Sequence, residues 1–369
     1  MATISAEELE ALRDALRRLL ADHGTEADVR RAMETPAGYD ADLWSKLAEM
    51  GIAGLVIDQA YGGSEAGPVE LEAVMEEAGA ALLCSPLLAS VLAAEFLRAL
   101  GDESAETRLL PRIADGTLIV SVALSAEYGD WAPEATEITA TRNGETWSLD
   151  GVAAYVLHGQ NADLLLAVAE SSEGPMVFEV DPSTDGVVVE PMPTFDHTLR
   201  LAKITFDGAE AAPLDPFVPV PDAVKQALDL ASVALAGEQA GGARRCLEFT
   251  VDYAKNRLQF GRAIGSFQAI KHMAADLLLE TESAISAARD AAASLSRGSP
   301  EACAAISLAA FACAEAFVTT TAASIQMHGG IAFTWDHPAH LYLRRARADA
   351  QLFGSAAFHR ERFLQEVGG

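Results

Sequence analysis

The order of residue periodicities along the 369-residue chain constrains its fold most strongly. From about residue 5 to 115, apolar residues recur every three or four positions, as in LWSKLAEMGI and VELEAVMEEAGA, which is typical of amphipathic helices. Between about 117 and 218 the chain shows short runs such as TLIVSVAL, EITATRN and LAKITFDG separated by turn residues, which indicates strands. From about residue 221 the helical period returns in long blocks rich in alanine and leucine.

This order predicts an α+β multidomain protein in an α, β, α arrangement. We expect an N-terminal all-α domain over 1–116, a middle β domain (a small barrel or sandwich) over 117–218, and a C-terminal helical bundle over 219–369. No internal repeat or low-complexity linker stands out, so we expect one compact unit. The expected helical blocks of the bundle are roughly 221–256, 266–296, 300–328 and 338–366.

The charge of the chain excludes several classes of partner. Its 26 basic and 54 acidic residues give a net charge of −28, which repels phosphate backbones and anionic lipid headgroups. We therefore expect neither nucleic acid nor a membrane surface as a partner. The longest apolar stretches are interrupted, one by Pro86 and one by Glu315 within 302–325, so we expect buried bundle helices there.

The cysteines and the start of the chain indicate a cytoplasmic protein. Cys84, Cys246, Cys303 and Cys313 form no CxxC pair, and the last three lie in Ala-rich, helix-like contexts, so we expect reduced, buried thiols. The opening MATISAEELEALRDALRRLL lacks the apolar core of a signal peptide and suits an amphipathic helix.

Two short motifs carry the chemistry. The segment NRLQFGRAIG, residues 256–265, joins two expected helices, and Arg257 and Arg262 can offer forked donors to a diphosphate. Phe260 offers a flat face, and Gly261 permits close backbone approach. The same segment would also suit an ordinary interhelical turn with surface arginines. The second motif, QMHGG at 326–330, would by itself be an ordinary glycine C-cap.

Together, RLQFGRAIGSFQAIKHMAADL and QMHGGIAFTWDHPAHLYLRRARAD resemble, in order and separation, the C-terminal domain of acyl-CoA dehydrogenases. The resemblance extends through FDHTLRLAKITFDG to essentially the whole chain and implies the acyl-CoA dehydrogenase fold. It also implies FAD-dependent α,β-dehydrogenation of an acyl-CoA thioester, with electron-transfer flavoprotein as acceptor. In the family, residues matching Arg257, Gln259, Phe260, Gln326, Gly329 and Gly330 hold the adenosine and diphosphate half of FAD across a dimer interface.

The half of the site that the family uses for catalysis departs from its pattern. The flavin-binding loop, usually like T-E-P-x-A-G-S-D, reads LSAEYGD at 124–130, and Leu157 replaces the threonine that lies near the flavin N5. The base is usually a glutamate nine residues beyond an arginine, and counting from Arg344 reaches Phe353. The alternative base position in other members falls on Ala231. Neither position holds a carboxylate, so we predict no catalytic residue in this chain.

Three hypotheses follow. The first is a non-catalytic subunit of an α2β2 heterotetramer, known among actinobacterial acyl-CoA dehydrogenases, whose homologous catalytic partner binds the acyl-CoA, including bulky or sterol-derived ones. The second is a self-sufficient homotetramer with a displaced base such as Asp229. Asp229, Glu238 and His158 all suit structural roles as well. The third is a flavin-free structural or acyl-CoA-binding protein, because fold does not imply function.

Overall fold

The computed structural model describes residues 5–127, 129, 131–132 and 135–368. Contacts between Cα atoms divide the chain into two compact units. The first holds residues 31–67 and 84–231, and the second holds residues 5–30, 68–83 and 232–368. Each unit is described by itself below, and the division into three domains at 116/117 and 218/219 remains our proposal.

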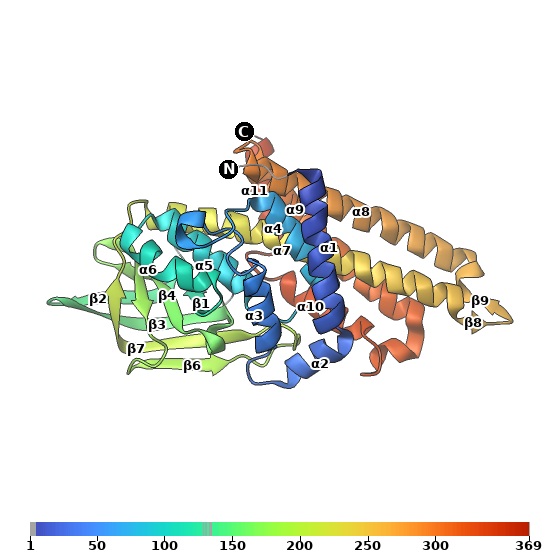
Figure 1. Cartoon of the computed structure of the whole chain (residues 1–369), viewed down its shortest axis with the longest axis horizontal. Helices are drawn as coiled ribbons and strands as arrows, with labels where there is room; N and C mark the ends of the chain where they lie inside the picture. Colours follow the sequence, from blue (N-terminus) through green and yellow to red (C-terminus); the bar gives the residue numbers. More distant parts are fainter. Residues whose placement is uncertain (1–4, 128, 130, 133–134, 369) are drawn as a thin grey trace. The chain divides into compact units, whose positions relative to one another are not determined.

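The first unit is built on a closed β-barrel (Figure 1). Strand β4 pairs with β2 and β5, β3 pairs with β2 and β7, and β5 pairs with β7, which completes the ring. Strands β1 and β6 extend it by pairing with β4 and β7. The predicted β segment is therefore confirmed. The strands are β1 (Val120–Ala123), β2 (Glu137–Asn143), β3 (Thr146–Leu157), β4 (Leu164–Ser171), β5 (Gly174–Val180), β6 (Val187–Pro191) and β7 (Leu201–Pro213).

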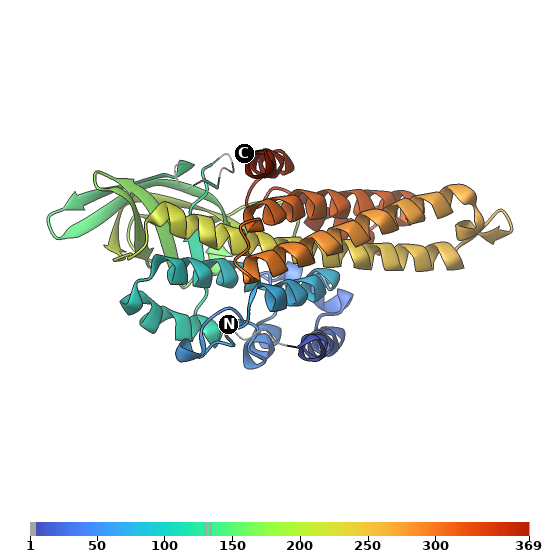
Figure 2. The same cartoon turned by 90° about the horizontal axis from the view of Figure 1, so that it is seen from above.

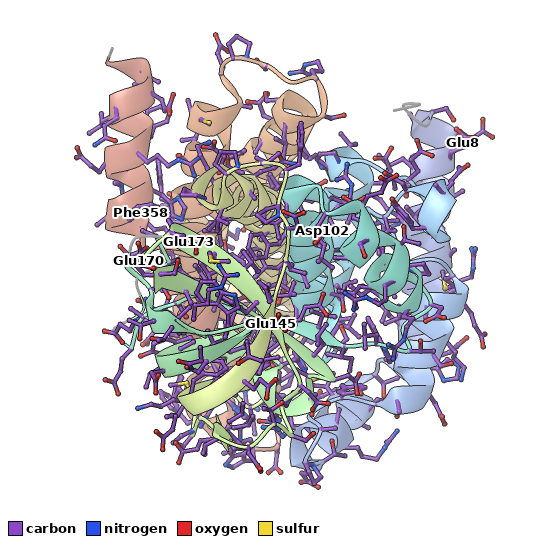
Figure 3. All side chains as sticks on the ribbon, turned by 90° about the vertical axis from the view of Figure 1, so that its left-hand side faces the viewer. Glu8, Asp102, Glu145, Glu170, Glu173 and Phe358 are labelled. Carbon is purple, nitrogen blue, oxygen red and sulfur yellow. The ribbon has the colours of Figure 1, made fainter. Side chains whose placement is uncertain are left out.

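Buried and exposed side chains alternate along these strands, so that one set fills the barrel interior and the other lies on its surface. Ile138, Leu149 and Phe178 belong to one fully buried apolar cluster inside the barrel. Glu145, in the turn between β2 and β3, and Glu170 with Glu173, in and after β4, are exposed (Figure 3). These three acidic side chains thus lie on the outer surface of the barrel.

Helices complete the first unit. Helix α5 contacts β1, and nearly all of its residues are buried, which explains its lack of an amphipathic pattern. The helices are α3 (Ala41–Glu49), η1 (Gln59–Tyr61), α5 (Leu87–Leu100) and α6 (Glu103–Ala114), and η3 (Gly159–Asn161) follows β3.

The second unit is a helical bundle in which α7, α8 and α9 run side by side (Figure 2). The expected blocks 221–256, 266–296 and 300–328 match α7, α8 and α9. The expected block 338–366 is wrong as one helix, because it divides into α10 and α11 at Phe353 and Gly354, whose φ angles are +58° and +120°. The bounds are α1 (Ala6–His23), α4 (Pro68–Ala80), α7 (Val220–Asn256), α8 (Gln268–Ser296), η4 (Ile264–Ser266), α9 (Ala302–His328), η5 (Gly329–Phe333), α10 (Ala339–Asp349) and α11 (Ala356–Val367). Helix α2 (Glu26–Glu34) and helix α7 contribute residues to both units.

Helix α9 is long and strongly apolar. By length and composition alone, Ala302–Phe333 could cross a membrane. We expected Glu315 to exclude a membrane span, but this single residue does not exclude it. The helix packs against α8, α10 and α11, and Cys313, Ala316 and Phe317 on it are buried. This packing matches the expected core helix of a bundle.

The four cysteines, all of them among the described residues, form no disulfide, in agreement with the expected reduced thiols. Cys84, Cys246 and Cys313 are buried, and burial raises the pKa of Cys246 to about 12, so that thiol stays protonated. Cys303 is only partly buried, which corrects the expectation for that residue.

A network of arginine side chains around buried glutamates joins four helices of the second unit. Glu76 on α4 accepts from Arg13 of α1 at 2.8 Å, from Arg289 of α8 at 3.0 Å and from Arg244 of α7 at 3.1 Å. Burial alone would raise the pKa of Glu76, but these three arginines lower it below its usual value. Glu72, one turn earlier, lies 3.5 Å from Arg13. Burial and the neighbouring Glu76 raise the pKa of Glu72 to about 7.

Helices α4 and α7 approach so closely that only glycine fits at the contact. A Cβ atom at Gly79 would overlap the carbonyl oxygen of Glu238, and one at Gly241 would overlap that of Glu76. Gly237 faces the backbone of Glu72 in the same way, with 2.7 Å from the Cβ position to the carbonyl oxygen. The glycines therefore set the distance at which the arginine–glutamate network forms.

Replacing Glu72 by glutamine should change the stability of the protein in a pH-dependent way. Folding raises the pKa of Glu72 from 4.5 to about 7, so the folded state binds more protons between these values. The free energy of unfolding of the wild type should therefore fall as pH rises through this window. Glu72→Gln should be nearly neutral at pH 5 and stabilising, on the order of 2 kcal/mol, at pH 8 in urea unfolding.

The exposed Glu282 provides the matched control on the same unit. Glu282→Gln should shift the urea midpoint little and equally at both pH values. A Glu72→Gln protein that is less stable than the wild type at pH 8 would contradict the assignment of Glu72 as a costly buried charge.

Alanine at Gly79 should destabilise the protein although alanine favours helices by about 1 kcal/mol over glycine. The added Cβ meets the Glu238 backbone, which cannot move away as a flexible side chain would. We expect a net loss of about 1–3 kcal/mol in chemical unfolding. Gly330→Ala is the control, because a Cβ there meets no atom within 4 Å. Equal effects of the two substitutions would rule out the close contact.

Candidate cofactor-binding site

The segment after α7 forms a small hairpin rather than a plain turn. Strands β8 (Leu258–Gln259) and β9 (Arg262–Ala263) pair with Gln259 opposite Arg262, and the Ile264 amide donates to the Arg257 carbonyl at 2.8 Å. The hairpin lies at the tip of α7 and α8 (Figure 1). Residues 256–262 are all exposed, so the two arginine side chains are accessible.

The hairpin holds Phe260 in an unfavourable conformation. Phe260 and Gly261 form the two-residue loop, with φ angles of +53° and +75°, as a type I′ turn requires. A bulky residue with positive φ is a conformational outlier, and such strain concentrates at functional sites. Phe260 is 91% exposed, and its ring lies edge-on to Phe267 at 6.1 Å between centroids. The turn therefore presents a flat apolar ring to the outside.

The second motif ends α9. Gln326 is exposed on the last turn, and the helix stops at Gly329, whose φ of +69° and ψ of −147° are accessible essentially to glycine alone. A Cβ atom added at Gly329 or Gly330 would meet no other atom within 4 Å, so the backbone here is open to close approach. The motif thus combines one exposed amide side chain with bare backbone.

Contacts between α7 and α9 bring the two motifs together. The hydroxyl of Tyr253, one turn before Arg257, donates to the His328 carbonyl at 3.4 Å, and the two rings stack at 4.3 Å between centroids. Met327 packs in one apolar cluster with Ala254 and Ile264. The guanidinium of Arg257 and the amide of Gln326 therefore belong to neighbouring helix ends. Exposed forked donors beside bare glycine backbone suit a diphosphate, and the ring of Phe260 suits a planar base.

Sequence reasoning missed the contribution of Tyr253 and Phe267 to this arrangement. Tyr253 links the two helix ends, and Arg262 lies 4.0 Å over the Phe267 ring in a cation–π contact. The four-residue spacing from Tyr253 to Arg257 places both residues on one helix face. This spacing was the signal in the sequence from which the contribution of Tyr253 could have been predicted.

In the first unit, the residues at the family's flavin-ring positions offer few groups to a ligand. Ser125 is buried, and its hydroxyl donates to the Ala154 carbonyl, so it is directed to the protein's own backbone. Leu157 is 3% exposed and apolar. Tyr128 and Asp130 of the expected loop lie outside the described residues.

The positions expected for a base hold no carboxylate. Phe353 is buried, at the break between α10 and α11, and Ala231 is fully buried within α7. Neither a methyl group nor a phenyl ring can accept an α-proton.

The carboxylates considered as substitutes have basic partners. Asp229 lies 2.9 Å from the Lys225 ammonium, one turn away on α7. Glu238 forms a buried ion pair with Arg345 of α10. His158 is 1% exposed, and its Nδ1 lies 3.0 Å from Asn161 Nδ2. These contacts give each of the three side chains a structural role.

Comparison with known proteins identifies the family. A model of the acyl-CoA dehydrogenase C-terminal domain matches residues 222–368, and a model of the N-terminal domain matches residues 6–117. Acyl-CoA dehydrogenase IpdE2 of Mycolicibacterium smegmatis is 35% identical over 98% of this chain and 99% of its own length. The chain belongs to the acyl-CoA dehydrogenase family. Members of this oxidoreductase family depend on FAD.

Solved structures confirm the acyl-CoA dehydrogenase fold and the likeness to heteromeric members. A variant of the Tcur3481-Tcur3483 steroid acyl-CoA dehydrogenase superposes with a TM-score of 0.88 at 30% identity, covering 98% of each chain. The ChsE4-ChsE5 complex of Mycobacterium tuberculosis gives 0.89 at 27% identity, covering 100% of this chain and 99% of the other. Butyryl-CoA dehydrogenase of Megasphaera elsdenii, at 21% identity and 0.85, shares the fold.

Breaking the Glu238–Arg345 pair should test whether Glu238 is structural in this acyl-CoA dehydrogenase. Both side chains are at least nine-tenths buried, so Arg345→Met leaves a buried charge unpaired and should cost about 3–5 kcal/mol in urea unfolding. Adding Glu238→Leu should recover much of that loss. The exposed pair Arg360–Glu315 is the control, and Arg360→Met should cost at most about 1 kcal/mol. Equal losses at the two sites would contradict the structural role.

Proposed function

We propose that this chain is a subunit of a heteromeric, FAD-dependent acyl-CoA dehydrogenase that carries no base of its own. Its role is to hold the adenosine and diphosphate half of the FAD whose flavin ring lies in a homologous catalytic partner. The observation that carries the proposal is the contrast between the two halves of the site. The clamp residues at the ends of α7 and α9 are all present and exposed, whereas Phe353 and Ala231 occupy the base positions.

The clamp residues fit the chemistry of FAD. The Arg257 guanidinium would donate to the diphosphate, and the Gln326 amide would add a further hydrogen bond. Gly329 and Gly330 would let backbone amides approach the phosphates, because no side chain covers them. Phe260 would lie against the adenine. Gln259, opposite Arg262 in the hairpin, is the remaining residue of the proposed clamp. Bound FAD supplies a hydride acceptor for the β-hydrogen of the thioester.

The residues of this chain position the cofactor and move no proton. A buried phenyl ring at 353 cannot take the α-proton of a thioester, and the hydroxyl of Ser125 is already committed to the Ala154 carbonyl. Proton abstraction therefore belongs to the partner. This division explains why one half of the site has kept its polar groups and the other has not.

Relatives support a heteromeric assembly and a bulky substrate. The ChsE4-ChsE5 structure is a complex of two named chains, and the Tcur3481-Tcur3483 structure is named a steroid acyl-CoA dehydrogenase. By analogy, this chain would form a heterotetramer in the cytoplasm, and its partner would bind a CoA thioester with a bulky, sterol-derived acyl group. Electron-transfer flavoprotein would take the electrons.

Substitution of the clamp should remove FAD from the assembled enzyme. Co-expression with the homologous partner, followed by purification, allows FAD per complex to be measured by absorbance after release. Arg257→Ala and Gln326→Ala should each weaken FAD retention by about tenfold or more, because a charge-assisted contact to phosphate is lost. The exposed Arg297 of the second unit is the control, and Arg297→Ala should keep the flavin content unchanged.

The same preparations separate the alternatives. The isolated chain should contain no stoichiometric FAD and show no dehydrogenase turnover. One FAD per isolated chain with turnover would establish a self-sufficient enzyme with a displaced base. Unchanged flavin in the Arg257→Ala complex would indicate a structural or acyl-CoA-binding chain.

A further inference from the structure

A second concave site lies in the helical unit, apart from the clamp. It is a cavity of about 650 Å³ formed by residues of α1, α2, α4, α7, α9 and α10. Among the described residues that line it, none is one of the six clamp residues. Its volume falls within the range of roughly 300–1,000 Å³ typical of small-molecule sites. No part of the proposed clamp function uses it.

One wall of the cavity carries three arginines in an otherwise acidic chain. Arg17 is held by Glu77, with Nη2 to Oε1 at 2.8 Å, and Arg244 is held by Glu76 and Glu77. Glu77 and Glu26 are the carboxylates among the described lining residues. Guanidinium groups are the forked donors that a carboxylate can use in this wall.

Arg245 is the arginine best placed to bind that anion. Its Nη1 lies 3.5 Å from Glu248 Oε2, a looser ion pair than those of Arg17, and half of its side chain is exposed. The guanidinium also faces the phenol of Tyr342. Burial raises the pKa of Tyr342, so the phenol remains a neutral donor beside the arginine. Its hydroxyl donates to the Ala80 carbonyl at 2.7 Å.

Another part of the lining is made of flat rings. Phe249 lies 5.4 Å from Tyr342 and 5.7 Å from His328 between centroids, and Tyr253 stacks on His328 at 4.3 Å. His337 follows at 4.4 Å from His328. Together these five rings form a continuous aromatic surface along the cavity. Such a surface favours a planar or ring-shaped apolar body over a flexible chain.

The two imidazoles in that surface are neutral. Burial lowers the pKa of His328, and burial together with His328 lowers that of His337. Nδ1 of His328 lies 2.8 Å from the Ser324 carbonyl and must donate to it, which leaves Nε2 as an acceptor. Nε2 is buried and has no hydrogen-bond partner among the described residues, although the ring lines the cavity. The positive charge of the site therefore comes from the arginines alone.

We propose that this cavity binds a small organic anion in which a carboxylate is attached to a flat ring system. The ring lies along Phe249, Tyr253 and the two histidines. The carboxylate accepts hydrogen bonds from Arg245. The cavity thus requires both a flat ring and a carboxylate. A bare phosphate lacks the ring system, and so does an unbranched fatty acid.

The test uses 2-naphthoate as the probe and isothermal titration calorimetry with the full chain. We expect saturable binding with one site per chain. Arg245→Gln should weaken binding of 2-naphthoate by about tenfold or more, because a charge-assisted contact is removed. The neutral 2-naphthamide should bind more weakly than 2-naphthoate to the wild type and be insensitive to Arg245→Gln. Phe249→Leu should weaken both probes.

Arg297→Gln is the matched control, since Arg297 is an exposed arginine of the same unit that does not line the cavity. Thermal unfolding of each variant confirms that it is folded, and Arg245 is exposed enough for its replacement to leave the core intact. Lack of saturable 2-naphthoate binding to the wild type would overturn the proposal. So would an equal loss in Arg245→Gln and Arg297→Gln, or equal affinity for the acid and the amide.

Discussion

The arginine–glutamate network around the buried Glu76 on α4 is the interaction on which the second unit depends. Glu76 receives Arg13, Arg244 and Arg289 from three other helices, and this is possible because Gly79 and Gly241 let α4 and α7 approach at backbone distance. Removing charges from water is costly unless each is paired, so the network tolerates few other arrangements of these helices. The position of α7, and of the site at its end, follows from it.

The proposed clamp and the positions expected for a base have opposite physical characters. The proposed clamp exposes polar and apolar side chains, including Phe260, which has a positive φ and is 91% exposed. The base and flavin-ring positions are closed by Phe353, Leu157 and an inward-directed Ser125. The exposed residues of the proposed clamp and the closed base and flavin-ring positions agree with our proposal that this chain assists chemistry performed by a partner.

His328 connects the clamp with the proposed anion site. It belongs to the QMHGG motif, yet its ring stacks between Tyr253 and His337 and lines the cavity rather than the exposed end of α9. Its carbonyl also accepts from Tyr253, so one residue supports both the junction of the motifs and the aromatic wall. A ligand in the cavity would therefore contact the residues that hold α7 and α9 together.

The sequence by itself determined the element types and the two motifs, because helical and strand periodicity and the positions of glycine are local properties. It predicted α7, α8 and α9 within a few residues, and the resemblance of its motifs to the acyl-CoA dehydrogenase family implied the clamp residues and the absence of a carboxylate at the base positions. It did not predict the break at Phe353 and Gly354. Tertiary structure alone decided that Glu238 meets Arg345, that Glu76 meets three arginines, and that Arg245 faces an aromatic wall. These partners come from distant parts of the chain, and only packing of the helices determines which of them meet.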